Sequence, residues 1–257
     1  MVKFFHHSLL IIFCYLLTGC IGLGSYNGDS LKGVGDDPPM LSLNPTPVNI
    51  LVIGGTSGVG LEIVKLSTKR GHQVTAVARR PERMPYSHPS LTLLKADITD
   101  QLAMMSVISD HEVIVSAVGI APTSKKVTVF SEGMKNVLAA MKKNTVSRLI
   151  TVSAVGAGDS HGHGGFIFDK LLNSTLILGS DITDKTRQEV LVQASETDWT
   201  IVRPGFLTDD KPTKQYRVLS NLQGIEVGAI SRADVAHFIL GSIEKELYVK
   251  QAVLLSN

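Results

Sequence analysis

The sequence predicts an α/β domain built on a doubly wound parallel sheet, and two observations lead to this class. Short apolar runs rich in Val and Ile alternate with longer segments of helical periodicity, as expected when buried strands alternate with crossover helices. The first apolar run also passes directly into a glycine-rich turn and then a helix. Because crossovers between parallel strands are right-handed, the helices are expected on both faces of the sheet.

Each expected element rests on a local pattern. Each short apolar run is expected to form a strand, and these runs are residues 48–53, 73–78, 91–96, 113–118, 148–153, 199–203 and 252–255. Helices are expected at 61–70, 100–109, 129–143, 183–195 and 231–244. Gly71 ends the first helix, and Asp100 is a suitable N-cap for the second. Residues 156–165 and 205–230 show no regular pattern, so we expect loops there that contact substrate at the carboxyl ends of strands.

Composition excludes several classes of function. The chain has 257 residues, of which 44% are hydrophobic, and this is enough for one large domain with a buried core. The formal net charge of +2 and the aromatic content of 5% argue against a dedicated nucleic-acid-binding protein. Both cysteines, Cys14 and Cys20, lie near the N-terminus, so the rest of the chain can form neither a disulfide framework nor a cysteine-ligated metal site.

The first 47 residues are expected to lie outside the fold. Lys3, the apolar run at 9–17 and the sequence Leu17-Thr18-Gly19-Cys20 are typical of an export signal. The end of this signal resembles the lipobox of bacterial lipoproteins, which implies lipidation of Cys20 and a membrane-anchored protein. Residues 21–47 are rich in Gly and Pro, so we expect a flexible tether. The alternative is that translation starts at Met40, which would leave a cytoplasmic protein.

A glycine-rich loop of sequence Gly-Gly-Thr-Ser-Gly-Val-Gly, residues 54–60, joins the first strand to the first helix. Glycines permit the tight turn and let backbone amides approach a pyrophosphate at the N-terminus of the helix. In this position the loop predicts dinucleotide binding by a Rossmann fold, whereas an isolated glycine triplet could serve turn geometry alone. The loop residues expected to contact the cofactor are Gly54, Thr56, Ser57, Gly58 and Val59.

Arginines at the end of the second strand indicate which dinucleotide is bound. Arg79 and Arg80, with Arg83 one turn further on, stand where an NAD-binding chain usually places a carboxylate for the ribose 2′-hydroxyl. A guanidinium instead suits a 2′-phosphate, through charge-assisted and bidentate hydrogen bonds. We therefore expect NADP(H), the alternative being a solvated basic loop with no partner.

Two further strand ends fit the same cofactor. Asp97 and Ile98 end the third strand, where a carboxylate and an apolar side chain can bracket an adenine. Ala117, Val118 and Gly119 end the fourth strand, where small residues allow the cofactor to lie close to the backbone. Either segment could also be an ordinary strand end.

Segments spread over residues 48–257 resemble one known group of proteins. They are the glycine loop and residues 78–81, 96–99, 129–137, 151–154, 198–205 and 230–236. Together they resemble the atypical short-chain dehydrogenase/reductase group with NmrA-like and NAD(P)H-binding members, nearest to the biliverdin reductase B / flavin reductase family. The resemblance implies a monomeric NADPH-binding domain that reduces flavins, tetrapyrroles or quinone-like small molecules.

The sequence departs from this group at residues that carry chemistry. No tyrosine is followed four residues later by lysine, which excludes the Tyr-x-x-x-Lys pair used elsewhere in the superfamily. Ser153 matches the serine at the end of the fifth strand and is the predicted catalytic residue, although it could simply satisfy a strand-end backbone group. Phe206 stands where the flavin reductase relatives carry histidine, and we expect it to stack against the acceptor.

Lys185 and Glu189 are spaced i, i+4 on an expected helix. Such a pair either forms a surface ion pair or lines the substrate site, as the matching helix does in relatives. We favour the surface role for Glu189, leave both roles open for Lys185, and include Lys185 among the candidate substrate contacts.

Two other groups of polar residues are not assigned to the site. His161 and His163 lie two apart in a glycine-rich segment, but the sequence offers no third ligand, so no metal site is expected. Asp209 and Asp210 are expected to form a solvated turn, because nothing nearby suggests burial.

Two functions remain compatible with these residues. The first is an NADPH-dependent reductase that passes a hydride to a flat, electron-poor acceptor such as a flavin, a tetrapyrrole or a quinone. A reducible flavin or quinone can take its proton from water, so with these acceptors the function requires no strong general acid. The alternative is a non-catalytic NADP(H)-binding sensor or assembly factor of the NmrA type.

Overall fold

The computed structural model describes residues 36–121, 123, 125–162, 179–222 and 227–257. Its main sheet has eight strands in the order β3-β2-β1-β4-β5-β6-β10-β8. Seven of them run parallel, and β8 runs antiparallel to β10. The bounds of the eight strands are β1 (Asn49–Ile53), β2 (Gln73–Ala78), β3 (Leu91–Lys95), β4 (Val113–Ser116), β5 (Arg148–Val152), β6 (Asp198–Pro204), β8 (Arg217–Leu219) and β10 (Gln251–Ser256). The doubly wound Rossmann class is confirmed, with the switch in strand order between β1 and β4.

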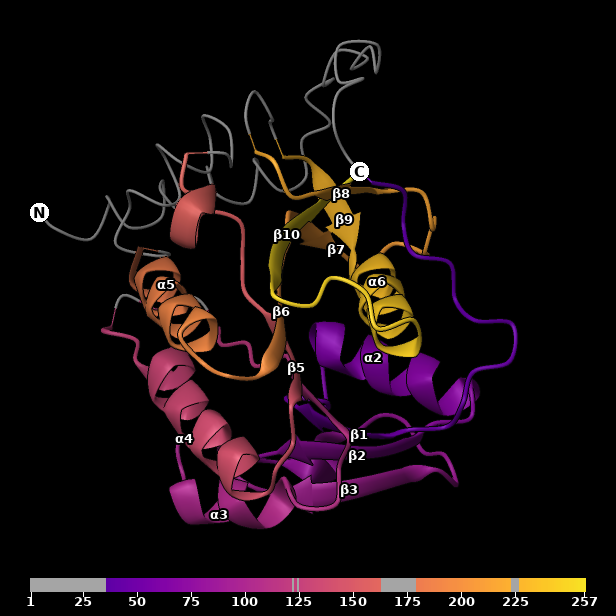
Figure 1. Cartoon of the computed structure of the whole chain (residues 1–257), viewed down its shortest axis with the longest axis vertical. Helices are drawn as coiled ribbons and strands as arrows, with labels where there is room; N and C mark the ends of the chain where they lie inside the picture. The colour runs from indigo at the N-terminus through magenta and orange to yellow at the C-terminus, as the bar shows by residue number, and fades with distance from the viewer. Residues whose placement is uncertain (1–35, 122, 124, 163–178, 223–226) are drawn as a thin grey trace, which may run out of the picture. The chain divides into compact units, whose positions relative to one another are not determined.

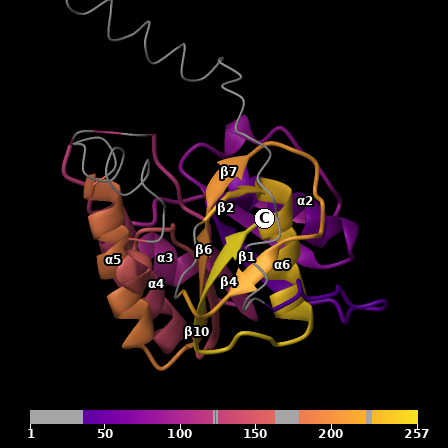
Figure 2. The ribbon, with the colours of Figure 1, turned by 90° about the horizontal axis from the view of Figure 1, so that it is seen from above.

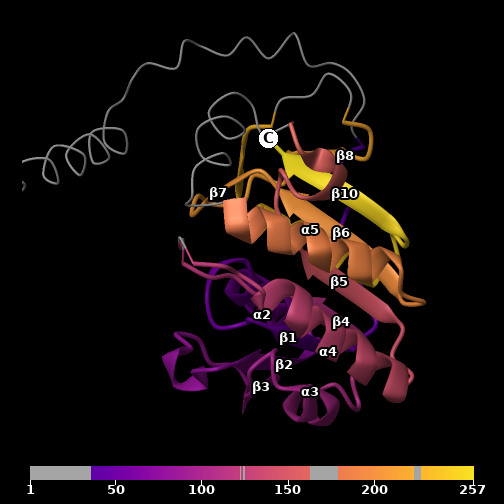
Figure 3. The ribbon, with the colours of Figure 1, turned by 90° about the vertical axis from the view of Figure 1, so that its left-hand side faces the viewer.

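Helices cover both faces of the sheet (Figures 1 and 2). On one face α2 (Gly58–Lys69) packs beside α6 (Arg232–Glu244). On the other face α3 (Gln101–Val107), α4 (Val129–Lys143) and α5 (Gly179–Gln193) form a row, which Figure 3 shows in front of the strands. Alternate residues of β1 enter two separate apolar cores: Ile50 and Val52 lie on the side of α2 and α6, whereas Leu51 and Ile53 lie on the side of α3 and α4.

The structure contains short elements that the sequence pattern did not predict. A two-stranded parallel sheet of β7 (Phe206–Thr208) and β9 (Ala229–Ser231), together with β8, lies in the stretch expected to be irregular. Single turns of 3-10 helix, η2 (Pro81–Arg83) and η3 (Gly158–Ser160), follow β2 and β5. These elements were missed because three residues are too few to show a period. Asp100 is the N-cap of α3 as predicted, since its side chain accepts a backbone N–H of its own helix, and Ser231 caps α6 in the same way.

Residues 36–47 belong to the folded domain. Asp36 and Val218 exchange two backbone hydrogen bonds of 2.8 and 3.1 Å, and Pro39 packs closely on Gly241 of α6. Residues 36–42, which were predicted to belong to a flexible tether, are instead held by hydrogen bonds and apolar packing. Residues 1–35, which include the predicted signal and Cys20, lie outside the described residues. In the part of the chain that the structure describes, no helix is long and apolar enough to cross a membrane.

Candidate functional site

The glycine loop is held in a conformation that requires glycine. Gly54 has a φ of +85° and donates its N–H to the carbonyl oxygen of Val77, 2.8 Å away. A Cβ atom at Gly54 would lie 2.8 Å from the carbonyl oxygen of Ala117, and a Cβ atom at Gly60 would collide with the Gly54 carbonyl oxygen. The loop therefore brings the start of α2 directly against the carboxyl ends of β1 and β4.

The first turn of α2 is open to an anion. Ser57 is its N-cap, but the side chain makes no capping hydrogen bond, and the first turn has no acidic residue. By contrast, carboxylate or hydroxyl groups of Asp100, Asp184 and Ser231 cap the starts of α3, α4 and α6. Free backbone amides and the positive end of the helix dipole fit a pyrophosphate. Of the predicted contacts, Ser57 and Gly58 are exposed, whereas the side chain of Val59 is buried in the core, so Val59 can contribute only backbone.

The predicted 2′-phosphate residues lie beyond the end of β2. Arg79, Arg80 and Arg83 are all exposed, and none of them forms a salt bridge with another described residue. Oδ1 of Asp97 accepts hydrogen bonds from the backbone N–H and the Oγ1 of Thr99, at 3.0 and 2.8 Å. These bonds, the backbone one first, and then the charge of Arg79 lower the pKa of Asp97. The guanidinium of Arg79 and the carboxylate of Asp97 thus share one edge of the site.

The residues that follow β3 and those that follow β4 are placed differently with respect to a bound cofactor. The side chain of Ile98 is only 5% exposed and packs on Gly133 of α4, where a Cβ atom would lie 2.7 Å from Cγ1 of Ile98. The side chain of Ile98 therefore belongs to the core, which leaves little of it accessible to bracket an adenine. Ala117 lies against the glycine loop, Val118 is half-buried, and Gly119 is exposed with open space around its Cα atom. This second strand end leaves room for a ligand close to the backbone.

Ser153 follows directly after β5 and is buried without a partner. The residue is 3% exposed, its N–H donates to the carbonyl oxygen of Val202, and its Oγ has no hydrogen-bond partner among the described residues. The alternative role, in which Oγ satisfies a strand-end backbone group, is not observed. Ser116, at the end of β4, also has a buried Oγ without a partner, and sequence reasoning did not single it out. A hydroxyl left unpaired costs about 1–3 kcal/mol, so two of them at adjacent strand ends suit an edge where a ligand supplies the partners.

Lys185 lies on α5 beside the end of β5. Its Nζ donates to the carbonyl oxygen of Val152 at 3.2 Å and lies 4.2 Å from the centre of the Phe130 ring. Burial lowers the pKa of Lys185 to about 8, although neighbouring carboxylates, Glu189 first, oppose the shift. The ammonium group is thus held one residue away from Ser153.

Glu189 is not on the surface, and its partner is Arg203 of β6. Both residues are at most 2% exposed, and two hydrogen bonds join the side chains, Nε to Oε1 at 3.1 Å and Nη2 to Oε2 at 2.6 Å. Nη1 of Arg203 also pairs with Asp159 of η3 at 2.5 Å. The surface ion pair favoured for Glu189 is therefore wrong. The i, i+4 spacing from Lys185 suggested the wrong partner, because the residue that pairs with Glu189 lies on another element.

The remaining candidates lie at the margin of the site. Phe206 begins β7, is 37% exposed, and donates its N–H to the carbonyl oxygen of Gly228. Asp209 is 90% exposed, as expected, and pairs with Arg232 at 2.8 Å. His161 is exposed, and His163 lies outside the described residues. Across the described ranges, no three His, Cys, Asp or Glu residues gather where they could hold a metal ion.

Comparisons with known proteins agree with this geometry. A family model described as NAD(P)H-binding matches residues 54–246. An uncharacterized chloroplastic protein of Arabidopsis thaliana is 29% identical over 212 residues, which cover 77% of this chain and 72% of that protein.

Solved structures show the same fold. ChuY, an anaerobilin reductase from Escherichia coli O157:H7, has a TM-score of 0.69 at 24% identity, covering 81% of this chain and 96% of that one. A short-chain dehydrogenase/reductase from Veillonella parvula in complex with NADP has a TM-score of 0.68 at 15% identity, covering 82% and 95%. The family match spans the glycine loop, the arginines, Ser153 and Lys185. The chain therefore has an NAD(P)-binding oxidoreductase fold and belongs to the NAD(P)H-binding family.

Proposed function

We propose that the protein is an NADPH-dependent reductase that transfers a hydride to a flat, electron-poor acceptor of the tetrapyrrole, flavin or quinone type. The observation that carries the proposal is the buried, unpartnered hydroxyl of Ser153 beside the ammonium group of Lys185. Both groups lie at the carboxyl edge of the sheet, where open α/β sheets bind their ligands. Two polar groups held at such an edge suit the recognition of a carboxamide or of an acceptor heteroatom.

The cofactor end of the site follows from the loop and the arginines. The free amides at the start of α2 hold the pyrophosphate, and Arg79 and Arg80 hold the 2′-phosphate. Asp97, whose pKa is lowered first by the hydrogen bond from the backbone N–H of Thr99, would lie beside the adenosine part. The nicotinamide would supply the hydride when it is bound, so the side chains of this site serve to bind and orient the two reactants.

Phe206 and one structural neighbour support the class of acceptor. Phe206 offers a partly exposed aromatic face just past β6, the strand that pairs with β5 and Ser153. A neighbouring structure is named an anaerobilin reductase, which makes a linear tetrapyrrole the first acceptor to test. The competing proposal is an NADP(H)-binding sensor, and the absence of any Tyr-x-x-x-Lys pair favours it.

The test is the anaerobic oxidation of NADPH with a linear tetrapyrrole, FMN, a quinone and a simple ketone. We expect turnover with the flat acceptors far above turnover with the simple ketone. Ser153→Ala should lower kcat, and Phe206→Ala should raise KM for the acceptor more than it lowers kcat. Ser106→Ala, which changes an exposed serine on α3, is the matched control. Tight NADPH binding without oxidation by any flat acceptor would establish the sensor instead.

A further inference from the structure

We propose that Asp181 is the catalytic acid of this site and protonates the acceptor as the hydride arrives. The proposal rests on the reductase function argued above and narrows its substrate class. The acceptor would be a conjugated system whose reduced form must gain a proton on nitrogen or oxygen, such as a linear tetrapyrrole or a conjugated carbonyl compound.

Asp181 is placed at the reacting edge by the direction of α5. Gln188 donates to Oγ1 of Thr151 at 3.1 Å, and Lys185, about one turn earlier, donates to the carbonyl oxygen of Val152. The helix α5 therefore runs antiparallel to β5, so residues nearer the start of α5 lie nearer the carboxyl end of β5. One further turn, about 5–6 Å, brings the chain to Asp181. Two strand residues of about 3.3 Å each span a similar length, so Asp181 lies level with the backbone just past Ser153.

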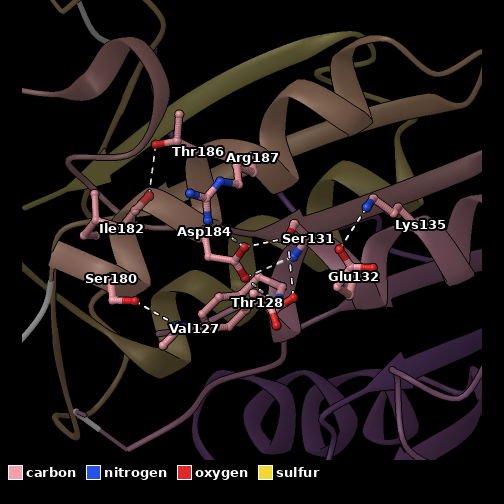
Figure 4. A network of polar contacts seen from close by, with 11 residues as sticks. Val127, Thr128, Ser131, Glu132, Lys135, Ser180, Ile182, Asp184, Thr186 and Arg187 are labelled. Carbon is pink, nitrogen blue, oxygen red and sulfur yellow. Dashed lines mark hydrogen bonds and ion pairs between the residues drawn. The ribbon is translucent and has the colours of Figure 1, made fainter. Parts of the chain in front are cut away.

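The first turn of α5 is firmly anchored on either side of Asp181. Oγ of Ser180 accepts the N–H of Val127 at 2.8 Å, and Asp184 accepts the N–H groups of Phe130 and Ser131 at the start of α4 (Figure 4). Ile182 enters an apolar cluster together with Val155, which follows Ser153 by two residues. These contacts fix the position of Asp181 without using its own carboxyl group.

The carboxyl group of Asp181 is buried and incompletely paired. The residue is 9% exposed, and Oδ1 has no hydrogen-bond partner in the described part of the chain. Asp184, only three residues away, accepts three hydrogen bonds and is structural by comparison. Burial raises the pKa of Asp181, Asp184 raises it further, and Lys185 opposes the shift. A buried carboxyl group with a raised pKa and an unpaired oxygen is better suited to deliver a proton than an exposed carboxylate.

The proposed step conserves atoms and electrons. The acceptor carbon gains a hydride from bound NADPH, which leaves as NADP⁺, and a new C–H bond forms. The π pair of the C=O or C=N bond, or of the conjugated chain ending in it, moves onto oxygen or nitrogen. That atom takes the proton as the O–H bond of Asp181 breaks. The ammonium group of Lys185 then stabilises the new carboxylate, and water restores the proton.

The kinetic test compares acceptors that must receive a proton from the protein with acceptors that can receive it from water. Asp181→Asn should lower kcat with a linear tetrapyrrole or a conjugated ketone by about 100-fold or more. Its rate with FMN, which can be protonated by water, should change by less than about threefold. Glu196→Gln, which changes a 92% exposed carboxylate, should leave both rates unchanged. Equal losses with the two kinds of acceptor, or no loss with either, would overturn the assignment.

A second readout does not depend on turnover. Carbon-13 NMR of the Asp181 carboxyl group should show a titration midpoint above its ordinary value of 3.8, and Lys185→Met should raise the midpoint further. Asp181→Asn should also be at least as stable as the wild type, because it removes a buried carboxylate with an unused oxygen. A midpoint at or below 3.8, or strong destabilisation, would make Asp181 a structural residue. If the midpoint is raised but no flat acceptor oxidises NADPH, the reductase function fails and Asp181 has no proton to deliver.

Discussion

Breaking the buried ion pair between Glu189 and Arg203 should cost more stability than any exposed pair in the molecule. Each residue is at most 2% exposed, and the side chains share two hydrogen bonds. The pKa of Arg203 lies above its ordinary value although burial alone would lower it, because the hydrogen bonds and charge of Glu189, and then Asp159, outweigh burial. Removing one member leaves the other charged in a place with little water.

The expected loss in the free energy of unfolding depends on which contacts each variant leaves in place. Removing one partner of a buried pair typically costs about 3–5 kcal/mol. Glu189→Gln leaves Arg203 its contact with the 82% exposed Asp159, so we expect a loss of about 3 kcal/mol, at the lower end. Arg203→Met leaves Glu189 without its hydrogen-bonding partner, so we expect about 5 kcal/mol. The double variant Glu189→Gln/Arg203→Met should lose less than the sum of the two single variants, because it leaves no unpaired charge.

Urea unfolding followed by circular dichroism measures these free energies. The control is the exposed pair of Glu132 and Lys135 on α4, at 2.8 Å with side chains about half exposed. Its disruption should cost no more than about 0.5 kcal/mol. A loss below about 1 kcal/mol for Glu189→Gln, or additive losses in the double variant, would refute the argument that burial makes this pair important for stability.

Three further predictions concern the cofactor, pH and the N-terminus. Replacing Arg79 and Arg80 with Gln should weaken NADPH binding by about 2–4 kcal/mol and spare NADH, and equal losses in calorimetry would contradict the 2′-phosphate role. Burial lowers the pKa of Lys185 from 10.5 to about 8, so its charge destabilises the fold below pH 8, and this penalty disappears as pH rises to 10.5. The stability of the wild type relative to Lys185→Met should therefore rise across that window, and a flat difference in urea titrations would argue against a buried charge. If Cys20 is lipidated, the intact mass should show a chain that begins at Cys20 and partitions with membranes, whereas a soluble product that begins at Met40 would mean that the lipobox match is accidental.

Sequence reasoning succeeded where the signal was local. β1, the glycine loop and α2 follow one another within some twenty residues, and both the alternation of elements and the glycine spacing can be read directly. It failed where burial depends on distant partners. Arg203 stands fourteen residues from Glu189, on another element, and no periodicity links the two. Nor could the pattern show that residues 36–42 pack on β8 and α6, because Gly- and Pro-rich composition predicts loops whether or not they are docked.

The buried face of α5 explains how stability and chemistry can coexist on one helix. Both carboxylate oxygens of Glu189 are hydrogen-bonded to Arg203 and both of Asp184 to the start of α4, and these contacts hold α5 in place. Lys185 and Asp181 occupy the same face nearer the carboxyl edge of the sheet, but they are incompletely paired, and burial shifts the pKa of each toward its neutral form. A fully paired group has no hydrogen-bonding capacity left for a ligand, whereas an unpaired one costs stability until a ligand arrives. The stability contributed by Glu189 and Asp184 can therefore offset the stability lost at Lys185 and Asp181. An acceptor that hydrogen-bonds Lys185 and Asp181 at the start of α5 would gain most in binding free energy.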